Sequence, residues 1–186
     1  GYSGIGKSSV VNELHKALVP ARGWFASGKF DQGKRNMPYA TLAQAFQSLV
    51  LGLLVKSESA LAVWREAFEA ALGPNGQLVT DVVPELKLII GEQPRVTDVP
   101  PLEAQRRLQV VFARFLRVFA QPDHPLVLFV DDLQWLDLAT LDCLEHLLTQ
   151  ADVRHLLVIG AYRDNEVDPD HPLMRKLQAI RNAGAA

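Results

Sequence analysis

Apolar residues along this chain fall into short continuous runs and into longer stretches with helical spacing. Two runs, residues 126–130 (LVLFV) and 156–161 (LLVIGA), show no alternation of apolar and polar positions. Such runs are typical of strands that are covered on both faces of a parallel sheet. A shorter, mostly apolar run at residues 24–30 (WFASGKF) predicts a further strand.

Between these runs, apolar residues recur every three or four positions, which predicts helices. The expected helices cover residues 9–19, 39–54, 61–72, 84–90, 103–119, 138–148 and 171–180. Strands that alternate with helices predict an α/β fold in which helices flank a parallel sheet. The segment from about residue 39 to 120 has no strand pattern, so we expect it to be a helical insertion.

The first eight residues, GYSGIGKS, fit the pattern G-x-x-x-x-G-K-[ST] of a phosphate-binding loop. Glycines let the backbone N–H groups approach phosphate oxygens, and the helix expected from Ser9 onward would point its N-terminus at the same anion. Lys7 would contact the β- and γ-phosphates, and the Ser8 hydroxyl would ligate Mg²⁺. The predicted nucleotide-binding residues are Gly1, Gly4, Ile5, Gly6, Lys7, Ser8 and Ser9. The alternative is a glycine-rich turn that merely precedes a helix.

Two acids, Asp131 and Asp132, follow the apolar run 126–130 directly. A hydrophobic strand that ends in acids is the second motif of nucleotide sites, in which the first carboxylate holds Mg²⁺. We therefore expect Asp131 to be a metal ligand together with Ser8. Asp132 is expected to orient or deprotonate the attacking water. Adjacent acids at a strand end also occur as turn formers and helix caps, and this reading stays open.

Arg163 follows the last apolar run, 156–161. The carboxyl ends of parallel strands converge on the ligand crevice, so its guanidinium is expected to sense the γ-phosphate. The alternative is a surface ion pair with Asp164 or Glu166. The predicted catalytic set is Lys7, Asp132 and Arg163. We expect Trp135 to be a packing residue beneath the site.

Composition restricts the classes of function. The chain has 186 residues, 48% hydrophobic and 22% charged, which suits one soluble domain with a core. A net charge of −2 gives no electrostatic reason to expect nucleic acid or a membrane surface as partner, and it disfavours a DNA translocase. Cys143 is the single cysteine and is expected to be buried. No run approaches the roughly 20 apolar residues of a membrane span, and no signal peptide is present, so a cytoplasmic location is expected.

The chain starts inside its first motif and without methionine. A phosphate-binding loop connects a strand to a helix, and here that strand has no residues. We therefore expect residues 1–186 to form a single partial domain cut from a larger protein, with its first strand truncated.

Several segments together resemble a known family. Residues 1–8, 127–137 and 160–167 resemble the AAA-like ATPase module of the signal-transduction ATPases with numerous domains (STAND). Four further segments are similar to the ATPase segment of bacterial multi-sensor kinases: residues 28–32 (GKFDQ), 38–40, 71–76 and 84–86. The resemblance implies an AAA-like (ASCE) P-loop fold, ATP and Mg²⁺ as ligands, and kinase, GAF and histidine-kinase domains as neighbours. It also allows an oligomer that forms in response to nucleotide.

Carried over by motif, the resemblance implies phosphate and metal roles for Lys7 and Ser8, paired acids at Asp131 and Asp132, and a sensor at Arg163. The leading hypothesis is an ATP-binding, slowly hydrolysing switch in a signalling kinase. The alternatives are a nucleotide-gated scaffold without turnover and a P-loop kinase that acts on a small molecule. Without its first strand and lid, the isolated chain is expected to be poorly stable and to bind nucleotide weakly. A compact, nucleotide-tight monomer in gel filtration would contradict that expectation.

Overall fold

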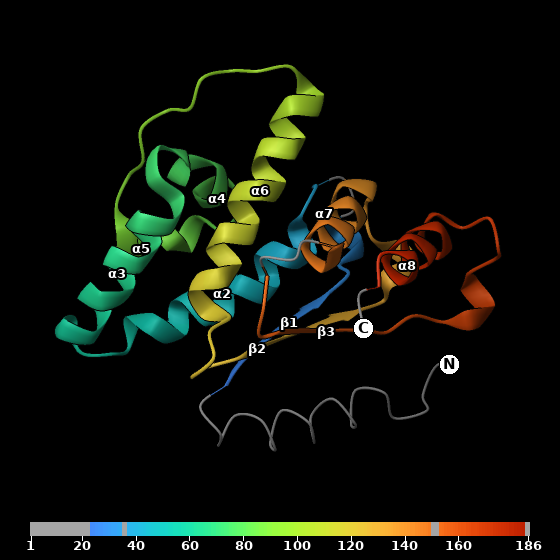
Figure 1. The fold of residues 1–186 in the computed structure, drawn as a ribbon, viewed down its shortest axis with the longest axis horizontal. Coiled ribbons are helices and arrows are strands. Elements are labelled where there is room, and N and C mark those ends of the chain that lie inside the picture. Colours follow the sequence, from blue (N-terminus) through green and yellow to red (C-terminus); the bar gives the residue numbers. More distant parts are fainter. Residues whose placement is uncertain (1–22, 35–36, 150–152, 185–186) are drawn as a thin grey trace.

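The centre of the fold is a parallel sheet of three strands. The computed structural model describes residues 23–34, 37–149 and 153–184. Its strands are β1 (Trp24–Lys29), β2 (Leu126–Asp131) and β3 (Leu156–Gly160), and they lie side by side in the order β1-β2-β3 (Figure 1). The predicted α/β class, with a parallel sheet and flanking helices, is confirmed.

The register of the strands places their carboxyl ends together. Lys29 pairs with Asp131 across β1 and β2, and Val130 pairs with Gly160 across β2 and β3. Strand β2 is central and buried from Leu126 to Val130, which explains its continuous apolar sequence. Among the described residues β3 pairs with β2 alone, and its Leu157 side chain is 51% exposed.

Helix α2 (Ala40–Leu54) packs closely against β1. Its contact requires Gly28, because a Cβ atom at that position would lie 2.3 Å from the backbone oxygen of Thr41. The helix begins after Tyr39, whose backbone has a left-handed φ of 64°. The Tyr39 N–H donates to the Thr140 hydroxyl at 3.2 Å, which ties the start of α2 to the helix that follows β2.

The segment between β1 and β2 is helical, as expected. It contains α2, α3 (Glu58–Leu72), α4 (Gly76–Val82), α5 (Lys87–Ile90) and α6 (Pro101–Phe119), which gather at the left of Figure 1. Aromatic rings from three helices form its core, with centroid distances of 5.4–6.1 Å among Phe46, Phe68, Phe112, Phe115 and Phe119. Helix α4 lies between the expected helices 61–72 and 84–90 and was not predicted, because it begins directly after Gly73, Pro74 and Asn75, residue types that ordinarily end a helix.

Helices α7 (Leu138–Thr149) and α8 (Pro172–Asn182) pack together on the other side of α6 from α3 in Figure 1. Lys176 of α8 bridges two acids of α7, at 2.6 Å to both Asp142 and Glu145. His171 caps α8 by accepting from the Leu173 N–H at 3.1 Å, a structural role. Cys143 is buried in the core, as expected. No helix among the described residues is long and apolar enough to cross a membrane.

Candidate nucleotide site

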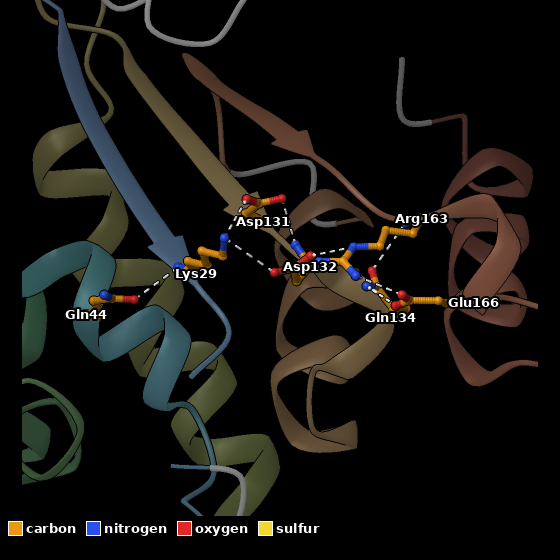
Figure 2. Close-up of polar contacts among 7 residues, drawn as sticks. All are labelled: Lys29, Gln44, Asp131, Asp132, Gln134, Arg163 and Glu166. Carbon is orange, nitrogen blue, oxygen red and sulfur yellow. Dashed lines mark hydrogen bonds and ion pairs between the residues drawn. The ribbon is translucent and has the colours of Figure 1, made fainter. Parts of the chain in front are cut away.

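The two predicted acids lie at the carboxyl end of the central strand. Asp131 is the last residue of β2, and its carboxylate Oδ1 accepts the Asp132 N–H at 2.9 Å (Figure 2). Their side chains are 15% and 13% exposed, so both carboxylates are largely screened from water while open on one side. This is the edge of the sheet at which parallel strands present ligand-binding groups.

The backbone at Asp132 adopts an uncommon conformation. Its φ of 55° and ψ of 46° lie in the left-handed region, which aspartate tolerates better than most residues. The turn is held on both sides, because the Ala161 N–H donates to Val130 at 2.9 Å and the Leu133 N–H donates to Ala161 at 2.9 Å. The chain therefore turns sharply after β2 and directs the Asp132 carboxylate toward the ends of β1 and β3.

Lys29 brings a cation to the two acids from the end of β1. Its Nζ lies 3.7 Å from Asp131 Oδ2 and 3.7 Å from Asp132 Oδ2, and Gln44 of α2 accepts its backbone N–H at 3.0 Å. The Lys29 side chain is 62% exposed, so these ion pairs are weak and easily exchanged. Lys29 was not among the predicted site residues. Its position at the end of a predicted strand could have indicated it, because the neighbouring strand of the sheet ends in the acid pair.

Arg163 reaches the same acids from the segment after β3. Its Nε lies 3.6 Å from Asp132 Oδ1, and its Nη1 donates to Glu166 Oε1 at 2.8 Å. The hydrogen bond and charge of Glu166, with the charge of Asp132, raise the pKa of Arg163 above its ordinary value. The alternative reading of a pair with Glu166 therefore describes the structure correctly, and the same guanidinium also faces the acidic site.

Glu166 is held in place by two further side chains. Gln134, which is only 5% exposed, donates to Glu166 Oε2 at 2.9 Å, and its Oε1 accepts the Arg163 backbone N–H at 3.4 Å. Burial raises the pKa of Glu166, but hydrogen bonds from Arg163, Gln134 and the Trp135 side chain outweigh it and hold that pKa below its ordinary value. The expectation that Trp135 packs beneath the site is wrong: its side chain is 49% exposed because it lies beside Glu166 at the surface.

The structure thus brings three predicted residues together, Asp131, Asp132 and Arg163, from the ends of two strands. The remaining predicted site residues lie outside the described residues: Gly1, Gly4, Ile5, Gly6, Lys7, Ser8 and Ser9. Lys29 and Gln134 are additions that the motifs did not reveal, because each meets a partner distant in sequence, whereas Glu166 was expected only as a surface partner of Arg163.

The acid pair suits Mg²⁺ bound together with phosphate. This ion is ordinarily held by one or two carboxylates, with phosphate oxygens and waters completing its shell. Asp131 and Asp132 supply such carboxylates at one point. Among the described residues no group of three or more His, Cys, Asp and Glu side chains could hold a metal by itself.

Comparison with known proteins agrees with this geometry. Residues 1–159 match the model of the AAA ATPase domain family. The chain is similar to hybrid signal transduction histidine kinase G of Dictyostelium discoideum, with 39% identity over 138 residues, 74% of this chain and 4% of that protein. It is also similar to histidine protein kinase 1 of Candida albicans, with 24% identity over 149 residues, 73% of this chain and 6% of that protein.

The chain thus spans only a small part of the length of these two relatives. No solved structure matches it significantly. Both relatives are eukaryotic, so the comparisons give no support to the bacterial origin that the sequence resemblance implied.

Proposed function

We propose that this chain, which belongs to the AAA ATPase domain family, binds ATP with Mg²⁺ and hydrolyses it slowly as a switch. The observation that carries the proposal is the meeting of Lys29, Asp132 and Arg163 at the carboxyl ends of three parallel strands. Two cations beside paired carboxylates form a site that can exchange its internal ion pairs for those of a metal–phosphate group.

The described residues have separate roles in this proposal. Asp131, at the end of β2, would hold the metal with its carboxylate. Asp132 orients the attacking water and receives its proton. Arg163 contacts the γ-phosphate. The phosphate-binding motif supplies Lys7 for the phosphates and Ser8 for the metal. When bound, Mg²⁺ would neutralise phosphate charge as a Lewis acid.

Slow turnover is supported by the state of Asp132. Both of its carboxylate oxygens face cations, with Oδ2 at 3.7 Å from Lys29 Nζ and Oδ1 at 3.6 Å from Arg163 Nε, so a water must compete with these cations for them. Asp132 acts on water only after one of these cations moves away. The same observation favours a second candidate function, a nucleotide-gated scaffold that binds ATP without turnover.

The wider setting of the proposal comes from the relatives and the resemblance. We propose a single ATPase domain of the STAND class inside a long cytoplasmic signalling kinase, with kinase and GAF domains of the same polypeptide as partners. The two similar proteins are named as histidine kinases, which supports a kinase setting. The phosphotransfer itself would belong to other domains.

The test is to measure Mg²⁺-ATP binding and turnover by the chain and by the longest natural polypeptide that contains it. Lys7→Ala is expected to weaken ATP binding about ten- to hundredfold, the effect of losing a charge-assisted contact. Asp132→Asn is expected to keep ATP binding and to lower turnover about 10²–10⁴-fold.

Asp170→Asn, which changes an exposed aspartate, is the matched control for Asp132→Asn and should alter neither quantity. Tight binding without turnover in the unaltered protein would favour the scaffold. Absence of ATP binding in both forms of the protein would refute the proposal.

A further inference from the structure

Glu166 forms an ion pair with Arg163, the residue to which the proposed function assigns contact with the γ-phosphate. Its Oε1 accepts from Arg163 Nη1 at 2.8 Å, which is the closest contact between charged groups at the site (Figure 2). The Arg163–Asp132 and Lys29–Asp132 contacts are longer, at 3.6 and 3.7 Å. The closest charged partner of Arg163 is therefore an internal carboxylate.

This carboxylate is fixed by its surroundings. Glu166 ends a short 3-10 turn, Asp164–Glu166, and its second oxygen accepts from the buried Gln134 side chain at 2.9 Å. The same Gln134 accepts the Arg163 backbone N–H at 3.4 Å. A residue held on two sides in this way stays in place when Arg163 leaves it, because Gln134 continues to satisfy one carboxylate oxygen.

We infer that Glu166 is a specificity-determining residue that sets the selectivity of the site between ATP and ADP by competing with the γ-phosphate for Arg163. The inference rests on the proposed function. Carboxylate and phosphate are interchangeable partners of a guanidinium, since both accept two N–H donors from its planar fork. An ATP γ-phosphate must displace Glu166, whereas ADP has no group at that position and leaves the ion pair intact.

The consequence is a penalty that falls on ATP alone. Glu166 lowers the affinity for ATP and leaves the affinity for ADP unchanged, so the site fills with ATP only when the ATP:ADP ratio is high enough. Glu166 and Arg163 are 23% and 35% exposed, so solvent screens their pair and the penalty is modest. A modest penalty suits a switch, because it shifts the balance without preventing ATP from binding.

The experiment compares dissociation constants for Mg²⁺-ADP and for a non-hydrolysable ATP analogue with an imido β,γ-bridge, using the full chain. Glu166→Gln removes the charge and keeps the size and the contact with Gln134. It is expected to tighten binding of the ATP analogue about two- to fivefold, which is what the loss of one partly exposed ion pair corresponds to. Binding of ADP should stay the same, and that result also shows that the variant is folded.

Two controls separate competition from a general effect. Glu145→Gln breaks a comparable ion pair with Lys176 between α7 and α8 and should leave the ATP:ADP selectivity unchanged. In an Arg163→Ala background, Glu166→Gln should have no effect on either nucleotide, because the guanidinium for which Glu166 competes is gone.

A second readout is tryptophan fluorescence. The Trp135 side chain interacts with Glu166 and is half exposed, so release of Glu166 from Arg163 should change its emission with the ATP analogue and not with ADP. The change should disappear in Trp135→Phe.

Unchanged or weaker binding of the ATP analogue by Glu166→Gln, with ADP binding intact, would overturn the inference and leave the proposed function standing. Absence of binding of either nucleotide, both by the unaltered chain and by the longest natural polypeptide that contains it, would overturn the proposed function and this inference with it.

Discussion

Asp132 shows how one residue links backbone conformation to chemistry. Its left-handed backbone, with φ of 55°, turns the chain at the end of β2 and aims the carboxylate at two cations. A non-glycine residue in this region stores strain, and such strain is common at functional sites. Aspartate and asparagine tolerate the region, whereas alanine tolerates it less well.

This conformation gives a prediction at the residue scale. Asp132→Asn and Asp132→Ala both remove the negative charge. The difference between their free energies of unfolding therefore reports the cost of placing alanine in the left-handed backbone conformation. We expect Asp132→Ala to have a free energy of unfolding about 1 kcal/mol lower than Asp132→Asn, measured by urea denaturation. Equal stabilities of the two variants would show that the turn is not strained.

At the scale of elements, the contact between strand β1 and helix α2 positions Lys29. The Gln44 side chain of α2 accepts the Lys29 N–H, and Gly28, one residue earlier, lets α2 approach the strand. A Cβ at Gly28 would meet the Thr41 backbone oxygen at 2.3 Å, and a backbone atom cannot turn aside as a flexible side chain can.

We therefore expect Gly28→Ala to destabilise the chain by about 1–3 kcal/mol, because α2 must move away from β1. Gly52→Ala is the matched control. Gly52 lies within α2, and a Cβ there would have no atom within 4 Å, so alanine should stabilise the helix by about 0.5–1 kcal/mol. Chemical denaturation measures both changes, and opposite signs are expected. A Gly28→Ala variant as stable as the unaltered chain would contradict this packing.

Helix α4 shows why element boundaries depend on packing. The residues at 73–76 combine glycine, proline and asparagine, which ordinarily mark a helix end, and they do end α3. A new helix nevertheless starts directly at Gly76, where the segment after α5 packs closely. A Cβ at Gly76 would lie 2.3 Å from the Gln93 side-chain oxygen, so a larger residue there would force that flexible side chain to move.

For the whole molecule, the extent of the main apolar core predicts cooperative unfolding. Among the described residues this cluster runs from Ala26 of β1 to Leu173 of α8 and contains Cys143 at 1% exposure, while Phe129 and Ala161 form a smaller separate cluster. Burial, together with the charges of Asp137 and Asp142, raises the pKa of Cys143 to about 12. The reactive thiolate is therefore almost absent from the folded chain at neutral pH.

We expect labelling of Cys143 by a thiol reagent to occur only through unfolding. The labelling midpoint in urea should coincide with the loss of helical circular dichroism, as a two-state transition requires. The unfolded thiol ionises near its ordinary pKa of 9.0 while the folded one stays protonated, so stability should fall as the pH rises from about 9 toward 12. Rapid labelling without denaturant would show that the core opens locally.

The sequence by itself determined the strands, most of the helices and the position of the acid pair. Continuous apolar runs and helical periodicity are local patterns in the sequence, so they predict which residues form strands and buried helix faces before the fold is known. The phosphate-binding motif at residues 1–8 and its Lys7 and Ser8 remain predictions, since they lie outside the described residues.

Tertiary structure alone decided which charges surround Asp132. Lys29 of β1 and Arg163, which follows β3, meet at Asp132 because parallel strands place their carboxyl ends at one edge. It also decided that Trp135 is half exposed and that Arg163 contacts Asp132 as well as Glu166. The physical reason is that these properties depend on distances between side chains from different elements, and a one-dimensional pattern does not contain those distances.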